Sequence, residues 1–179
     1  MKWRKLGHVF LPPSADWHVS HAALPVVDPS PDSVTVYFTS RDQNNRSRIG
    51  RFDFDPTRPQ DPIQPYPDSL IDQGPLGAFD DSGCTTASLV SVGVDKYLYY
   101  TGWSLGVTVP FYLGIGLAIG DGTKFEKVSR APILGRDETD PFLVGSPCVL
   151  REEGRWRMWY SSGVRWVQEN GRPKHYYHI

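Results

Sequence analysis

The sequence has no long apolar run, no strong net charge and no extended helical pattern, and each absence narrows the class of protein. No stretch approaches the roughly 20 apolar residues that a transmembrane helix needs, and residues 1–16 lack the continuous apolar stretch of a signal peptide. The 179 residues carry a net charge of -1 with basic residues scattered, which gives no electrostatic basis for binding nucleic acid or an anionic membrane. We therefore expect a cytoplasmic protein with no nucleic-acid or membrane partner.

The composition favours strands over helices. The chain contains 17 Gly, 16 Pro and 13% aromatic residues, and no apolar pattern of period 3.6 extends over a useful length. Cysteine is scarce: Cys84 and Cys148 are the two present. A disulfide between them is one interpretation, and we favour the other, two small buried apolar side chains. These features predict an all-β fold.

Three aromatic segments recur at nearly constant spacing, residues 34–41, 96–103 and 155–163. Aligning Tyr37, Tyr99 and Trp159 gives steps of 62 and 60 residues. A fixed period of this length is typical of repeat architectures in which each repeat is one supersecondary unit. The sequence therefore predicts three copies of one unit.

Each unit opens with a short apolar strand about ten residues before its aromatic strand, which predicts a hairpin. Further strands are expected at 47–54, 112–118 and 124–128, whereas 58–75 is interpreted as a connection between units. Four antiparallel strands per unit, repeated radially, form a β-propeller. The predicted fold is a single partial propeller domain with blade one at about 18–58, blade two at about 80–130 and an incomplete blade three at about 140–179.

Functional residues of a propeller are expected where loops enter the inner strands and where the aromatic strands end, because these points surround the mouth of the central channel. Acidic residues recur before the second and third opening strands. The predicted catalytic candidates are His21, Asp80, Asp81 and Glu138. The predicted substrate contacts are Arg41, Asp42, Asn45, Arg46, Trp103, Ser146, Tyr160 and Trp166. No metal ligands and no cofactor are predicted.

Carboxylates beside Trp and Arg side chains suit a sugar, because aromatic rings stack on pyranose faces, Arg and Asn bind hydroxyls, and two carboxylates can act on a glycosidic bond. Structural roles compete with this interpretation, since Asp and Asn also form turns. Adjacent side chains of an extended chain face opposite ways, so we expect only one of Asp80 and Asp81 to enter the channel. Asp137 and Asp140 are alternatives to Glu138, and His21 is equally a histidine at the edge of the core.

Several segments resemble bacterial glycosyl hydrolase-like proteins: 21–25, 37–42 with 45–50, 74–83, 98–103, and 146–149 with 157–163. These are similar to the five-bladed propeller superfamily of the family 43 arabinanases and xylosidases, the invertases and levansucrases, and the family 130 mannoside phosphorylases; families 32, 62 and 68 belong to the same group. The resemblance implies a five-bladed-type propeller of which this chain forms three blades. It covers nearly the whole chain and is more specific for the fold than for the reaction.

The resemblance implies an Asp base in blade one, an orienting Asp in blade two and a Glu acid in blade three. Asp80 or Asp81 matches the second and Glu138 the third. The first position is occupied by His21 and Ala22, with Asp16 five residues upstream. We therefore expect weak or undetectable glycoside hydrolysis, with His21 or Asp16 as the substitute base if turnover occurs.

Two hypotheses about function follow. The first is a glycoside hydrolase or related enzyme acting on a glycosidic bond, and the second is a non-catalytic sugar-binding or scaffold propeller in polysaccharide biosynthesis. Either takes a carbohydrate or nucleotide sugar as its ligand. An arc of three blades also exposes apolar faces at both ends, so we expect self-association.

Overall fold

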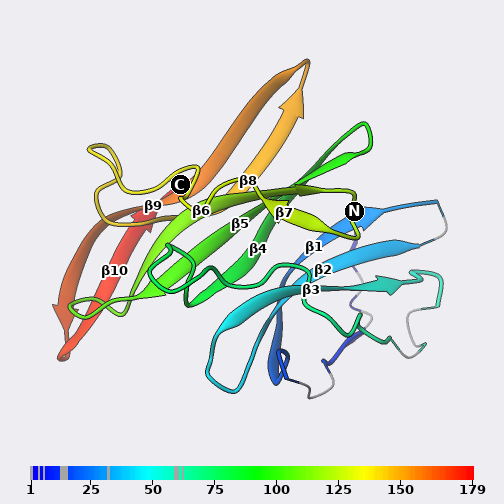
Figure 1. Cartoon of the computed structure of the whole chain (residues 1–179), viewed down its shortest axis with the longest axis horizontal. Helices are drawn as coiled ribbons and strands as arrows, with labels where there is room; N and C mark the ends of the chain where they lie inside the picture. The colour runs from blue at the N-terminus through cyan, green and yellow to red at the C-terminus, as the bar shows by residue number, and fades with distance from the viewer. Residues whose placement is uncertain are drawn as a thin grey trace.

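A computed structural model describes residues 2, 3, 5, 7–12, 16–31, 33–58, 61 and 63–179. In these residues the chain forms ten strands, β1 to β10, and no helix, so none could span a membrane. Figure 1 shows the strands as three groups that fan out in chain order, β1–β3 in blue and cyan, β4–β7 in green, and β8–β10 in orange and red. The predicted all-β architecture is confirmed, and each group is called a blade.

Blade one consists of β1 (Ser20–Pro29), β2 (Val34–Arg41) and β3 (Ser47–Phe54), all antiparallel. A single bridge between Ile49 and Ile71 stands where a fourth strand was expected. The segment between them is rich in proline, which cannot donate a ladder hydrogen bond. The outer edge of blade one is therefore covered by irregular chain.

Blade two has the four strands that the repeat predicts. They are β4 (Gly83–Val92), β5 (Asp95–Leu105), β6 (Phe111–Gly120) and the short outer β7 (Phe125–Lys127). Val92 pairs with Asp95, so two residues turn the first hairpin. Gly93 adopts φ 63° there, the left-handed conformation that such a tight loop requires.

Blade three contains β8 (Val144–Glu152), β9 (Arg155–Glu169) and β10 (Arg172–His178). A single parallel pair, Ser47 with Gly83, joins blades one and two into a seven-stranded sheet, and blade three forms a separate sheet. The inner strand β4 contacts both β1 and β8. The three inner strands therefore lie side by side along the channel.

The main core fills the space between blades one and two. Its buried members come from both blades: Tyr37, Ile49, Ile71, Cys84, Leu98, Tyr100 and Ala118. A second cluster covers the other side of blade one, where Trp17 lies over Gly50 and Phe10 packs on Phe38 and Phe52. The aromatic strand of blade one is thus buried on both of its faces.

Neighbouring blades are tied by a repeated hydrogen bond, which we call the inter-blade latch. The backbone N–H of Thr86 in β4 donates to Thr39 Oγ1 of blade one at 2.9 Å, and that of Ser146 in β8 donates to Thr101 Oγ1 of blade two at 2.8 Å. The donors are 60 residues apart and the acceptors 62, which matches the period of the repeat. Each aromatic strand therefore holds the inner strand of the blade that follows it.

The two cysteines differ, and the expectation that both are buried is wrong for Cys148. Cys84 is fully buried in the main core, whereas Cys148 is exposed on β8, and neither is in a disulfide. Burial raises the pKa of the Cys84 thiol well above its ordinary value, so its reactive thiolate is scarce.

We expect Ellman's reagent to modify one thiol per chain in the native protein and two in urea. Cys148→Ser should remove the native reaction and leave one thiol that reacts only on unfolding. Rapid modification of Cys84 in the folded protein would contradict this assignment of the core.

Candidate functional site

The inner strands each carry a bulge at the same place in the repeat. The register shifts between Ala23 and Val26 in β1, between Thr86 and Ser88 in β4, and between Gly145 and Cys148 in β8. Leu24 and Ser146 lie inside two of these bulges and adopt φ 52° and 50°. Bulges bend a strand and redirect its side chains, and they are common beside binding sites. Here they turn the inner strands at one end of the channel.

A cavity of about 480 Å³ opens at that end. It is bounded by the ends of β2 and β5, the turn into β6, and the inner strands β4 and β8. Its polar lining residues are Arg41, Asn45, Thr85, Thr101 and Ser146, and its apolar ones are Trp103, Leu105, Pro110, Phe111 and Leu113. Residues from all three blades therefore meet in one cavity.

Four of the predicted substrate contacts, Arg41, Asn45, Trp103 and Ser146, line this cavity. A smaller hollow of about 270 Å³ between the bulges shares Thr85, Thr101 and Ser146 with it. The cavity thus continues along the channel. We call it the mouth cavity.

The aromatic and cationic groups of the mouth cavity are held in place. Trp103 Nε1 donates to Ser47 Oγ at 2.7 Å, and the Arg41 guanidinium carbon lies 5.8 Å from the centroid of the Trp103 ring. Arg41 Nη1 also donates to Asn45 Oδ1 at 2.8 Å. Gly83, with φ 151°, allows this arrangement, because a Cβ there would lie 2.2 Å from Ser47 Oγ. The indole ring is therefore fixed before any ligand arrives.

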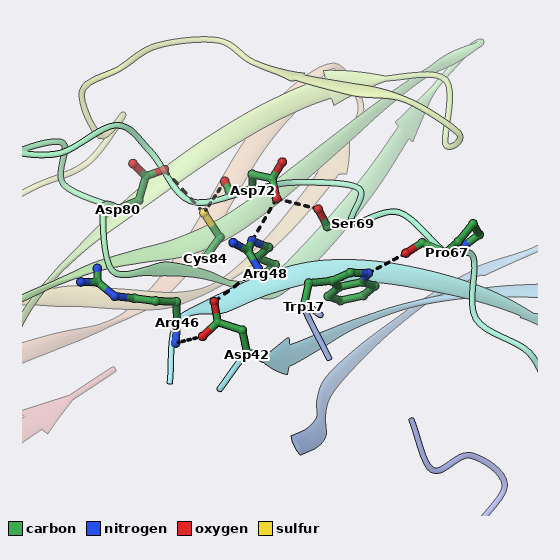
Figure 2. Close-up of polar contacts among 9 residues, drawn as sticks. All are labelled: Trp17, Asp42, Arg46, Arg48, Pro67, Ser69, Asp72, Asp80 and Cys84. Atoms are coloured by element: carbon green, nitrogen blue, oxygen red, sulfur yellow. Dashed lines mark hydrogen bonds and ion pairs between the residues drawn. The ribbon is translucent and has the colours of Figure 1, made fainter. Parts of the chain in front are cut away.

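Asp42, Arg46 and Asp81 line a neighbouring polar pocket of about 540 Å³, which shares Leu105 with the mouth cavity. Arg46 Nη1 donates to the backbone oxygen of Asp81 at 2.7 Å. Asp42 accepts the backbone N–H of Arg46 at 2.9 Å and pairs with Arg48 at 3.4 Å (Figure 2). These bonds shape the loops around the cavity.

Asp80 lies in the core and does not line the mouth cavity. Its carboxylate accepts hydrogen bonds from Lys127 Nζ at 2.6 Å and from Tyr100 Oη at 3.1 Å. Cys84 Sγ lies 3.5 Å from the same carboxylate (Figure 2). Burial raises the pKa of Tyr100, with smaller contributions from Cys84 and Asp80, so its hydroxyl remains a donor. This arrangement fits a structural ion pair between β7 and the segment before β4.

The same pairing recurs 60 residues later, where Tyr160 Oη donates to Asp140 Oδ2 at 2.7 Å. Ser162 also donates to the buried Asp140, and the hydrogen bond from Tyr160 raises the pKa of that tyrosine. Tyr160, a predicted substrate contact, is therefore bound to a carboxylate of its own blade. The repeat spacing of Asp80 and Tyr100 was the signal that could have identified this pair.

The remaining predicted residues lie outside the mouth cavity. Glu138 is exposed; its neighbours Arg136 and Asp137 line another hollow of about 610 Å³, which shares Leu113 with the mouth cavity. His21 is exposed, with φ 69° and its Nδ1 at 2.8 Å from Ser20 Oγ. Trp166 packs edge-on against Phe111, which itself lines the cavity. Among the residues described, no three His, Cys, Asp or Glu side chains are grouped to hold a metal ion.

Comparisons with known proteins place the fold. No protein-family model matches the chain. Two uncharacterized proteins from strains CDC 1551 and H37Rv of Mycobacterium tuberculosis are each 42% identical over 178 residues, which is 98% of this chain and 60% of theirs. The chain therefore spans 60% of the length of the curated relatives it matches.

Solved structures with the same arrangement include glycosidases. The BT0996 complex with RGII gives a TM-score of 0.66 at 16% identity over 93% of this chain and 55% of that protein. A glycoside hydrolase gives 0.64 at 13% identity over 93% and 58%, and sucrose-6-phosphate hydrolase from Lactobacillus gasseri gives 0.56 at 16% identity over 73% and 26%. The chain thus has the fold of five-bladed propeller glycosidases over part of its length, as the sequence predicted.

Proposed function

We propose that the chain is a carbohydrate-active protein whose mouth cavity holds a sugar or nucleotide sugar. The observation that carries this proposal is the fixed Trp103 ring, which lines the mouth cavity together with Arg41, Asn45 and Ser146. An immobilised indole gives a flat apolar surface for a sugar ring at little conformational cost. The guanidinium, amide and hydroxyl groups supply donors and acceptors for sugar hydroxyls.

Sugar binding should depend on Trp103. In calorimetry against a panel of oligosaccharides and nucleotide sugars, we expect Trp103→Ala to weaken binding at least tenfold, which corresponds to about 1.4 kcal/mol. Trp156→Ala is the matched control, because Trp156 contacts Tyr97 near the opposite end of β5. Equal affinity of wild type and Trp103→Ala would remove the basis of the proposed site.

Glycosidic bond hydrolysis is the second candidate function, favoured by the fold shared with glycoside hydrolases. Hydrolysis needs two carboxyl groups flanking the scissile bond, and no carboxylate lines the mouth cavity within the part of the chain that the structure describes. Asp81 in the adjoining pocket and Glu138 are the acids proposed for it, with His21 as the base.

A turnover assay with a panel of aryl glycosides tests hydrolysis, and calorimetry with the sugars named above measures affinity. We expect weak or undetectable turnover, and Asp81→Asn and Glu138→Gln should leave sugar affinity unchanged. Robust turnover that both substitutions abolish would instead establish the enzyme and its acids.

A further inference from the structure

Two arginines beside the channel mouth are bonded to neutral groups. Arg41 lines the mouth cavity itself, and its Nη1 donates to the side-chain oxygen of Asn45 at 2.8 Å. Arg46 lines the adjoining polar pocket, where its Nη1 donates to the backbone oxygen of Asp81 at 2.7 Å and to Ser82 Oγ at 3.1 Å. Within the described residues, neither guanidinium forms an ion pair with a carboxylate.

A third arginine, Arg136, lines the hollow that shares Leu113 with the mouth cavity. Its guanidinium carbon lies 4.5 Å from the centroid of the Tyr112 ring. It forms no hydrogen bond or ion pair with the part of the chain that the structure describes. An aromatic ring positions such a cation without neutralising its charge. Arg41, Arg46 and Arg136 therefore surround one opening as cations without an acidic partner.

The aspartates beside these arginines are bonded to their own loops. Each accepts backbone N–H groups at 2.7–3.0 Å: Asp42 from Asn44 and Arg46, Asp81 from Gly77, and Asp137 from Thr139 and Asp140. Asp42 also pairs with Arg48 at 3.4 Å. Hydrogen bonds from loop amides are a usual structural role of aspartate, so these carboxylates shape the loops and pair with none of the three arginines.

The charge balance around the mouth is positive, although the whole chain carries a net charge of -1. Arg41 is the one charged side chain that lines the mouth cavity in the described part of the chain, and the smaller hollow between the bulges has none. The two adjoining hollows add three arginines and three aspartates. The four arginines therefore exceed the three aspartates by one positive charge, and that charge belongs to the mouth cavity.

We propose that the mouth cavity selects an anionic sugar, whose carboxylate or phosphate binds Arg41 beside the Trp103 ring. This rests on the proposed function and narrows its ligand to a uronate, a sugar phosphate or a nucleotide sugar. Arg41 Nη1 is bonded to Asn45, whereas its Nε and Nη2 make no hydrogen bond with the described residues. A planar guanidinium with such donors binds carboxylate and phosphate oxygens in pairs, and a neutral sugar supplies no counter-charge for it.

Calorimetry with charge-matched pairs of ligands tests the proposal. Trigalacturonate and glucuronate are each compared with their methyl esters, and the 1-phosphates of glucose, galactose and mannose with the free hexoses. We expect the charged member of at least one pair to bind about tenfold more tightly, because hydrogen bonds to charged acceptors are stronger. Raising NaCl from about 0.05 to about 0.5 M should reduce this preference, since salt screens partly exposed charges.

Substitutions of Arg41 test where the anion binds. Arg41→Gln keeps an amide donor without the charge and should reduce the preference to about twofold or less, whereas Arg41→Lys keeps the charge without the planar fork and should retain part of it. Arg151→Gln is the matched control, because the Arg151 guanidinium carbon lies 5.8 Å from the centroid of the Trp156 ring, as that of Arg41 does from Trp103, but outside the mouth cavity. It should leave the preference unchanged.

The pairs also separate the two kinds of anion. A preference confined to the uronates identifies a carboxylate ligand, and one confined to the phosphates identifies a sugar phosphate or nucleotide sugar. Equal binding of charged and neutral members, weakened by Trp103→Ala, overturns this inference and leaves the proposed function standing. A preference that Arg41→Gln does not change overturns it as well. If no member of any pair binds, the proposed function fails and this inference fails with it.

Discussion

Asp80→Asn should lower the free energy of unfolding by about 3 kcal/mol, because removing one member of a buried ion pair leaves the other charge without compensation. Asp80 is 2% exposed, and its carboxylate holds both Lys127 and Tyr100. The loss falls at the lower end of the usual range because the Lys127 side chain is 23% exposed and water stabilises its charge. Urea denaturation followed by tryptophan fluorescence measures the change.

Two variants serve as controls. Asp81→Asn should change stability by less than about 1 kcal/mol, since its carboxylate bonds lie in a surface loop, to Gly77 N–H and Ser82 Oγ. Adding Lys127→Met to Asp80→Asn should recover part of the loss, because the uncompensated ammonium is removed. Equal decreases in the free energy of unfolding for Asp80→Asn and Asp81→Asn would show that the Asp80–Lys127 ion pair does not stabilise the fold.

Gly116→Ala is expected to destabilise blade two by about 2–3 kcal/mol, the usual cost of overpacking a filled core. A Cβ at Gly116 in β6 would lie 2.1 Å from the Tyr100 ring and 2.5 Å from its hydroxyl. Tyr100 is fully buried and bonded to Asp80, so it cannot move aside cheaply. Thermal and urea unfolding provide the measurement.

Gly114→Ala, two residues earlier on the same side of β6, is the matched control. Its Cβ would meet Pro132 at 3.0 Å and Phe79 at 3.1 Å, so small shifts of half-buried side chains relieve the contact. If Gly114→Ala lowers the free energy of unfolding as much as Gly116→Ala does, strand flexibility and not the contact with Tyr100 explains both effects.

The aromatic strands could be predicted because their side chains face packed blades on both sides. The expected segments at 34–41 and 47–54 coincide with β2 and β3, and 96–103 lies within β5. The outer edges were less predictable, since they depend on contacts with other segments. The last hairpin pairs β10 with β9 from Arg172 onward, a strand that the sequence analysis did not delimit.

The mouth cavity could be predicted in part. Arg41, Asn45, Trp103 and Ser146, which line it, follow from the rule that the loops into the inner strands and the ends of the aromatic strands surround the channel mouth. The sequence could not tell which carboxylates are structural, because the partner that buries Asp80 is Lys127, 47 residues away. The sequence also could not predict that Cys148 is exposed, because its burial depends on which segments pack against β8.

The inter-blade latch makes the contact between neighbouring blades depend on very few side chains. Its donor is a main-chain amide, which every residue except proline offers, so only the strand bend and one hydroxyl on the neighbour must be kept. Blades joined in this way can diverge in sequence while the arrangement persists. This fits the fold shared with the glycoside hydrolase that is 13% identical in sequence over 58% of its own chain.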